Sequence, residues 1–103
     1  MVTISSCPDY RYPSVKKAIE EALAPLGGME AFVKRGERVL LKPNLLSAKE
    51  PSRGVTTHPS VVEAVGEMVR EAGGDPFIGD SPAIGPFRRV ASKTGMEEVA
   101  RRL

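Results

Sequence analysis

The chain has 103 residues, of which 41% are hydrophobic and 27% charged, values typical of a single soluble globular domain. Its formal net charge of +2 and aromatic content of 5% indicate no surface for nucleic acid. No apolar run approaches the ~20 residues of a membrane span, and the start of the sequence lacks a signal-peptide pattern. We therefore expect a cytoplasmic protein with no membrane partner.

The first half of the sequence predicts a strand followed by a helix. Residues 1–6 alternate apolar and polar side chains, which is typical of a short strand. From Ser14, a plausible N-cap, apolar residues recur at helical spacing up to Leu26, and Pro-Leu-Gly-Gly at 25–28 ends that helix. Residues 29–33 add one further helical turn.

The second half repeats this alternation. Residues 39–41 form a short apolar run stopped by Pro43, as in a strand buried in a parallel sheet. A long polar loop leads to a helix that starts at Pro59 and ends in Ala-Gly-Gly at 72–74. Residues 76–80 predict another strand, and two short helical pieces broken at Gly95 follow.

The predicted order is β-α-β-α-β-α, in one α/β domain spanning residues 1–103. We expect three layers around a short, mostly parallel sheet, equivalent to half of a Rossmann-like fold. In such sheets, ligands bind beyond the carboxyl ends of the strands, close to helix N-termini. The polar motifs of this sequence fall at that edge.

Two motifs lie on either side of the long loop. Lys42 and Asn44, in Lys-Pro-Asn, follow the second predicted strand, where the ammonium group could face a phosphate or carboxylate and the amide could orient a ligand or hold the loop. The alternative is a strand terminator with a solvated lysine. Thr56, Thr57 and His58 open the next helix, where hydroxyls, N–H groups and the helix dipole favour an anion. The alternative is simple N-capping by Thr57 or His58.

A third motif, Gly-Asp-Ser-Pro, ends the last predicted strand. Asp80 could bind a cation, pair with Lys42 or orient His58, and Ser81 could be a nucleophile if a base lies nearby. Alternatively, both side chains satisfy a local turn. The block resembles that of the GDSL hydrolases, but neither aspartate nor histidine follows it here, so the GDS-type serine hydrolase hypothesis is disfavoured. His58 and Asp80 are the candidate catalytic residues, and no dinucleotide or Walker signature is present.

Together, "VLLKPNLL", "GVTTHPSVVEAVGEMVREAGG" and "FIGDSPAIG" resemble the family known as domain of unknown function 362. The resemblance supports the same positions: Lys42, Asn44, Thr57, His58, Asp80 and Ser81. It implies a longer protein, of which this chain is an N-terminal portion, and an association with 4Fe-4S clusters held on cysteine-rich segments. Cys7 is the only cysteine, so it can form no internal disulfide and cannot hold a cluster or a structural zinc alone. We expect no metal or cofactor in this chain.

Two functions from different classes follow. The first is binding of an anionic small molecule, a phosphate or carboxylate, through Lys42, Asn44, Thr56, Thr57, His58, Asp80 and Ser81. The second is an interaction or assembly module, because the open edges of a short sheet pair readily with another chain. Its partner would be a second copy or the C-terminal segments of a larger iron–sulphur or redox protein. The sequence does not decide whether the protein is an enzyme.

Overall fold

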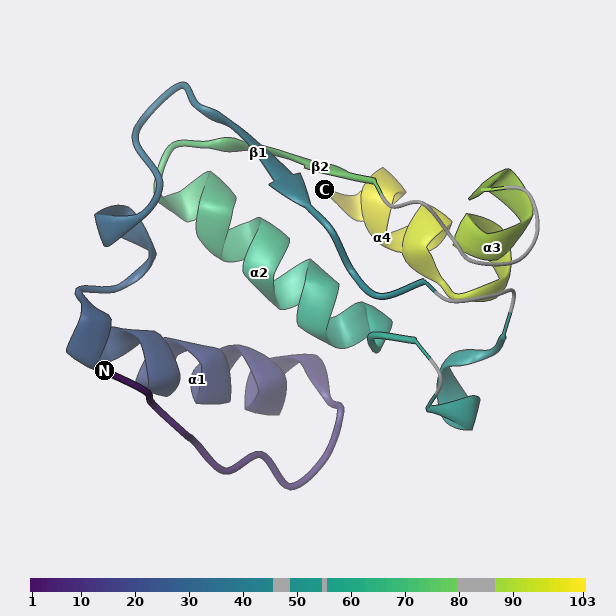
Figure 1. Cartoon of the computed structure of the whole chain (residues 1–103), viewed down its shortest axis with the longest axis horizontal. Helices are drawn as coiled ribbons and strands as arrows, with labels where there is room; N and C mark the ends of the chain where they lie inside the picture. Colours follow the sequence, from purple (N-terminus) through teal and green to yellow (C-terminus); the bar gives the residue numbers. More distant parts are fainter. Residues whose placement is uncertain (46–48, 55, 80–86) are drawn as a thin grey trace.

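The structure is a computed structural model that describes residues 1–45, 49–54, 56–79 and 87–103. Four α-helices, three short 3₁₀ helices and two strands lie in these residues (Figure 1). They are α1 (Tyr12–Leu23), η1 (Ala24–Leu26), η2 (Met29–Ala31), β1 (Arg38–Leu41), η3 (Pro51–Arg53), α2 (Pro59–Glu71), β2 (Asp75–Ile78), α3 (Phe87–Lys93) and α4 (Met96–Arg102). The protein is therefore of mixed α/β composition.

The sheet is parallel, as predicted, but it has two strands in the described residues. Strand β1 pairs with β2 from Arg38 opposite Asp75 to Leu41 opposite Ile78. Helix α2 connects the two strands and packs against both of them. The βαβ unit is confirmed by this arrangement, whereas the three-layer, Rossmann-like arrangement is not.

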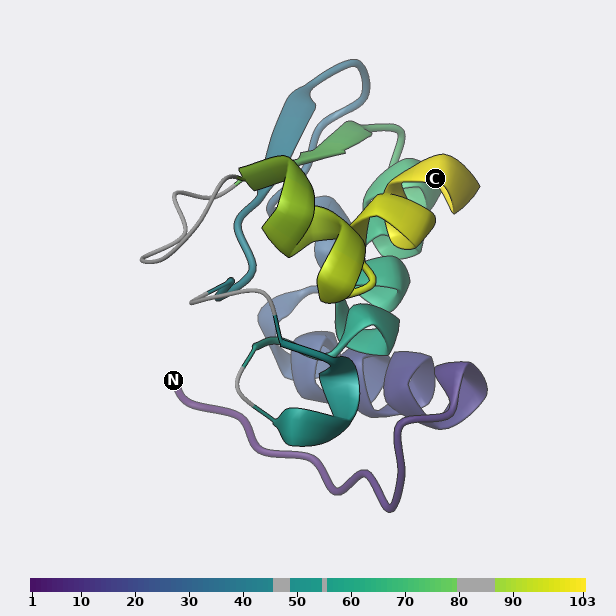
Figure 2. The ribbon, with the colours of Figure 1, turned by 90° about the vertical axis from the view of Figure 1, so that its right-hand side faces the viewer.

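The two faces of the sheet differ in how they are covered. Leu41 is buried on the face that α2 covers, and α4 packs against β2. On the other face, Leu40 is 50% exposed and its register partner Phe77 is 40% exposed. The Arg38 guanidinium lies 4.5 Å from the centroid of the Phe77 ring and partly shields it. Figure 2 shows the strands at the margin of the molecule, with the described helices leaving one face bare.

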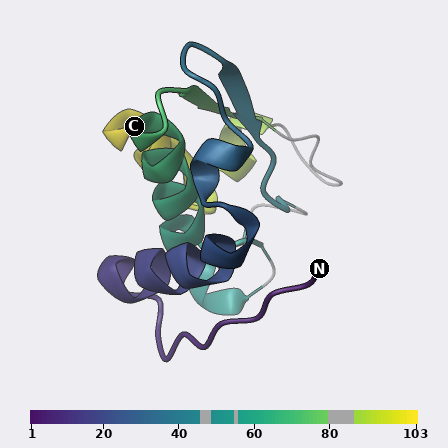
Figure 3. The ribbon, with the colours of Figure 1, turned by 90° about the vertical axis from the view of Figure 1, so that its left-hand side faces the viewer.

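The prediction of a strand at residues 1–6 is wrong for this structure. Residues 1–11, the amino-terminal segment, contain no helix or strand. Val2 is 89% exposed and Ile4 is 93% exposed, so their alternating apolar side chains are not buried against anything. Figures 1 and 3 show the segment running beside α1, away from the two strands. A strand pattern forms no strand without a neighbour to supply hydrogen bonds and an apolar surface.

Helix starts and stops follow local chemistry. Helix α1 begins at Tyr12 rather than after Ser14, because Pro13 fits the first turn, and Arg11 occupies the N-cap position. Helix α2 begins at Pro59 with His58 as its N-cap, one of the two caps predicted. Gly95 takes a φ of 85° and separates α3 from α4, which confirms the predicted break.

The hydrophobic core lies between the sheet and the helices that cover it. It includes a residue from the loop after β1, Leu45, which has no exposed surface. The buried members of this cluster are Val33, Leu41, Leu45, Val62, Val69, Val90, Met96 and Val99. The start of the long loop is therefore anchored in the core. Among the described residues, no helix is both long and apolar enough to cross a bilayer.

Candidate functional site

The carboxyl end of β1 and the start of α2 are joined by two reciprocal hydrogen bonds. The Asn44 backbone N–H donates to Thr57 Oγ1 at 2.9 Å, and the Thr57 N–H donates to the Asn44 carbonyl at 3.1 Å. These residues lie 13 positions apart in the sequence. The long loop thus leaves and returns at one point, which brings two of the predicted motifs together.

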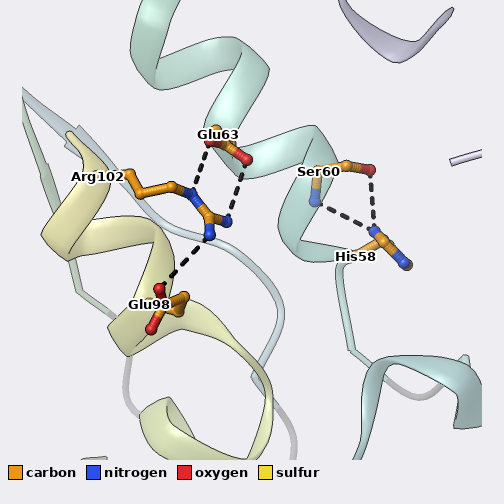
Figure 4. A network of polar contacts seen from close by, with 5 residues as sticks. All are labelled: His58, Ser60, Glu63, Glu98 and Arg102. Carbon is orange, nitrogen blue, oxygen red and sulfur yellow. Dashed lines mark hydrogen bonds and ion pairs between the residues drawn. The ribbon is translucent and has the colours of Figure 1, made fainter. Parts of the chain in front are cut away.

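His58 caps α2 with its side chain. The Ser60 N–H donates to His58 Nδ1 at 3.1 Å, and Ser60 Oγ lies 2.9 Å from the same nitrogen (Figure 4). Because Nδ1 accepts from the backbone, the neutral ring carries its proton on Nε2. Burial lowers the pKa of His58 from its ordinary value, so the ring is neutral near pH 7 and Nε2–H is a hydrogen-bond donor.

Three N–H groups at the start of α2 already have partners within the chain. The Thr57 N–H is held by Asn44, the Ser60 N–H by the His58 ring, and the Val61 N–H donates to the His58 carbonyl at 3.1 Å. Pro59 has no N–H. These N–H groups of the predicted cradle are therefore engaged within the chain. An anion at this edge cannot use these three N–H groups.

Lys42 and Thr57 line the same groove. It is a cavity of about 300 Å³ between the outer edge of β1 and helix α2. Its walls are Leu40, Leu41, Lys42, Pro43, Thr57, Val61, Val62 and Val65. Lys42 itself is exposed, while Pro43 beside it is buried. The groove therefore has an apolar floor, and its polar lining residues, Lys42 and Thr57, lie at the carboxyl end of β1.

Thr56 is a buried polar residue of this region, as is Ser60. It is 8% exposed, and its Oγ1 has no hydrogen-bond partner in the part of the chain that the structure describes. A buried hydroxyl without a partner is unfavourable by about 1–3 kcal/mol.

Asp80 and Ser81 lie outside the described residues, so their predicted roles stay predictions. Cys7 is exposed, and its thiol donates to the Asp9 carbonyl at 3.0 Å. No group of three His, Cys, Asp or Glu side chains with metal-binding geometry occurs in residues 1–45, 49–54, 56–79 and 87–103. A 4Fe-4S cluster needs four thiolate ligands. The donors of this chain do not fit such a cluster.

The structure adds two residues that the sequence analysis did not select. The Tyr10 ring stacks on His58, with centroids 4.1 Å apart and planes 7° from parallel. Ser60 holds the imidazole through its N–H and hydroxyl. A serine two positions after a helix cap is a weak sequence indication of such a role, so Ser60 could have been selected. Tyr10 had no such indication, since its contact joins two segments distant in the sequence.

Charged contacts elsewhere on α2 belong to the scaffold. The Arg102 Nε lies 2.9 Å from Glu63 Oε1 and its Nη1 lies 3.6 Å from Glu98 Oε1, so the side chain ties α4 to α2 (Figure 4). Arg102 is half exposed, and such pairs contribute little to stability in water. A larger open cavity of about 910 Å³ beside α3 is lined by Glu50, Arg88, Arg89, Ser92, Lys93 and Glu97. It contains none of the predicted site residues.

Comparison with known proteins gives a family and one relative. The sequence profile described as Domain of unknown function (DUF362) matches residues 39–103. The chain is 50% identical over 94 residues to a protein of Synechocystis sp. named as thylakoid-associated. The aligned region covers 91% of this chain but 29% of the relative, so the chain spans less than a third of that protein's length. No solved structure matches.

Proposed function

The chain belongs to the domain of unknown function 362 family, and from that premise we propose that it binds an anionic small molecule at the carboxyl edge of its sheet. The ligand class is a phosphate or a carboxylate. The observation that carries the proposal is the junction of the loop after β1 with the start of α2, where Lys42 and Thr57 line one groove. In this junction, Asn44 and Thr57 hold the two segments together.

Each side chain has a distinct role in the proposed site. Lys42 supplies positive charge. The Thr57 oxygen accepts from the Asn44 N–H, so the hydroxyl hydrogen can be donated to a ligand. His58, neutral and with its proton on Nε2, adds a second donor without a charge.

The remaining predicted residues complete the proposal. Thr56 contributes a buried hydroxyl that lacks a partner among the described residues. Asp80 is proposed as the orienting or cation-binding carboxylate and Ser81 as a further ligand contact. For a catalytic role, His58 remains the predicted acid–base candidate and Asp80 a further candidate catalytic residue, and no reaction is assigned to them.

A titration with inorganic phosphate and, separately, with acetate tests this proposal. Backbone amide NMR shifts should move together at Lys42, Asn44, Ser60 and residues 56–58, with a dissociation constant at or below about 10 mM. Lys42→Gln should weaken binding about tenfold, equivalent to ~1.4 kcal/mol. Asp80→Asn should alter the affinity or its dependence on Mg²⁺.

Lys34→Gln is the matched control. Lys34 is exposed and precedes β1, so this substitution removes the same charge at the opposite end of the strand. It should leave the affinity unchanged within about twofold. Shifts scattered over the surface, or equal losses in both variants, would mean non-specific attraction of anions and would reject the proposal.

A second function, an assembly module, is favoured by the bare face of the sheet. Leu40 and Phe77 lie side by side on that face and are 50% and 40% exposed. In a three-layer α/β fold this face would be covered by further helices. We propose that a second copy, or segments of a longer protein, cover it. Light scattering tests the first case: a dimer should dissociate in Leu40→Ser, and a monomer at all concentrations argues against self-assembly.

The cytoplasmic location predicted from the sequence remains a prediction. The name of the Synechocystis relative favours an alternative, peripheral association with a membrane. Cell fractionation distinguishes the two locations. A cytoplasmic protein should stay in the supernatant. A peripheral membrane protein should sediment with membranes and be released by salt.

A further inference from the structure

The outer edge of β1 is an open strand edge beside an apolar groove. The Glu37 and Leu41 carbonyls accept from the Asp75 and Gly79 N–H groups of the β2 side, at 2.8 and 3.1 Å. Backbone groups alternate in direction along a strand, so the N–H and C=O of Leu40 face away from β2. Strand β1 pairs with β2 alone in the described residues. An edge of this kind accepts another strand.

The groove under this edge has the surface that such a strand would cover. On α2, Val61 and Val65 are half-buried and line it, together with Leu40 and Leu41. Val61 also lines a neighbouring cavity of about 360 Å³, whose walls include Cys7, Pro8, Asp9 and Tyr10. Val61 therefore lies between the groove and the cavity at the end of the amino-terminal segment.

We propose that residues Val2–Ser6 of this chain dock on the outer edge of β1 as a third, parallel strand. Val2 and Ile4 alternate with polar residues and are 89% and 93% exposed where they lie now. Docking would turn both side chains toward Val61 and Val65. It requires the segment to leave the side of α1, where the Ser5 hydroxyl donates to the Ala18 carbonyl at 2.5 Å.

The stack of Tyr10 on His58 sets the direction of this strand. A strand parallel to β1 must end at the carboxyl end of β1, beside Lys42 and Thr57. The Tyr10–His58 contact holds the following turn at that same point, next to the start of α2. Docking would place Cys7–Tyr10 at the edge that carries Lys42 and Asn44. The segment would then form a further wall of that site, with the Asp9 carboxylate and the Tyr10 phenol as added polar groups.

Parallel pairing also assigns the hydrogen bonds. Side chains of paired residues point to the same face of a sheet. Val2 and Ile4 would therefore pair with the inward-facing residues of β1. Either Thr3 or Ser5 would then pair with Leu40. In either register, Leu40 bonds to a backbone group of Ile4. Docking would cover the groove that Lys42 and Thr57 line, so it is tested without ligand.

Amide hydrogen exchange of the full chain tests the proposal. The Leu40 N–H should exchange at least about a hundredfold more slowly than an exposed amide. Ile4→Ser should remove most of that protection, while the matched variant Thr3→Ser should keep it. Contacts between the Ile4 methyl groups and Val61 or Val65 should appear in NOE spectra. Since Ile4 is outside the core, Ile4→Ser should remain folded.

Two outcomes overturn the proposal. The first is a Leu40 N–H that exchanges as an exposed amide in the unmodified chain. The second is protection that rises with protein concentration and accompanies a dimer in light scattering, because the strand would then come from a second copy. Loss of the anion titration with retained Leu40 protection leaves the docking proposal intact and rejects the proposed function alone.

Discussion

The loop after β1 and the amino-terminal segment both lead into a helix, yet their described residues are held very differently. The loop buries Leu45 completely and is joined to α2 by the Asn44–Thr57 pair. The amino-terminal segment exposes Val2 and Ile4 almost fully. An apolar side chain stabilises a segment only where the surrounding elements offer a surface to cover it. Local pattern alone does not create that surface.

The largest effect should come from the anchor of the loop. Leu45→Ala removes a side chain with no exposed surface, and we expect the free energy of unfolding to fall by about 2–5 kcal/mol. Leu40→Ala, with the same chemical change on a side chain that is 50% exposed, should lower it by about 1 kcal/mol. Urea unfolding measures both. Equal losses would contradict the burial difference between these two positions.

Substitutions of two neighbouring threonines should change the free energy of unfolding less, and in opposite directions. Thr57→Val removes the acceptor for the Asn44 N–H, and we expect a loss of about 1–2 kcal/mol. Thr56→Val replaces a buried hydroxyl that has no partner among the described residues. The free energy of unfolding of this variant should therefore be unchanged or higher by up to about 1 kcal/mol. Thermal unfolding of both variants checks this. A destabilised Thr56→Val would show that its hydroxyl has a partner.

The smallest effect concerns the point where the two regions meet, His58 under Tyr10. Burial lowers the pKa of His58 in the folded protein, so the unfolded chain takes up the proton at higher pH. The contribution of neutral His58 to the free energy of unfolding is complete above its ordinary pKa of 6.5. This contribution is lost as the pH falls from 6.5 through the lowered pKa of the folded protein. Protonation of Nδ1 ends its acceptance from the Ser60 N–H, so we expect a loss of about 0.5–1 kcal/mol, as for a helix cap.

His58→Asn is the control for this pH dependence, because asparagine caps helices without titrating in this range. The free energy of unfolding of this variant, measured from pH 7.5 to 5, should vary less than that of the unmodified chain. Identical profiles for the two proteins would assign the pH dependence to other groups.

Periodicity predicted the helices well because their apolar stripes and stop signals are local. The break at Gly95 and the start of α2 at Pro59 were both found in this way. Of the predicted site residues, Lys42 and Thr57 line one groove, and Asn44 is hydrogen-bonded to Thr57. Tyr10 could not be predicted to join it, since stacking on His58 depends on where a whole segment lies. The roles of Asp80 and Ser81 remain predictions.

The sequence by itself determined the helices, the parallel pair β1 and β2, the family and the positions of the polar motifs, because caps, glycines and apolar spacing act over a few residues. The tertiary structure alone decided that the Thr57, Ser60 and Val61 N–H groups are bonded within the chain, and that residues 1–6 lie beside α1 without forming a strand. Both depend on contacts between distant segments, whose geometry is set by packing of the whole chain.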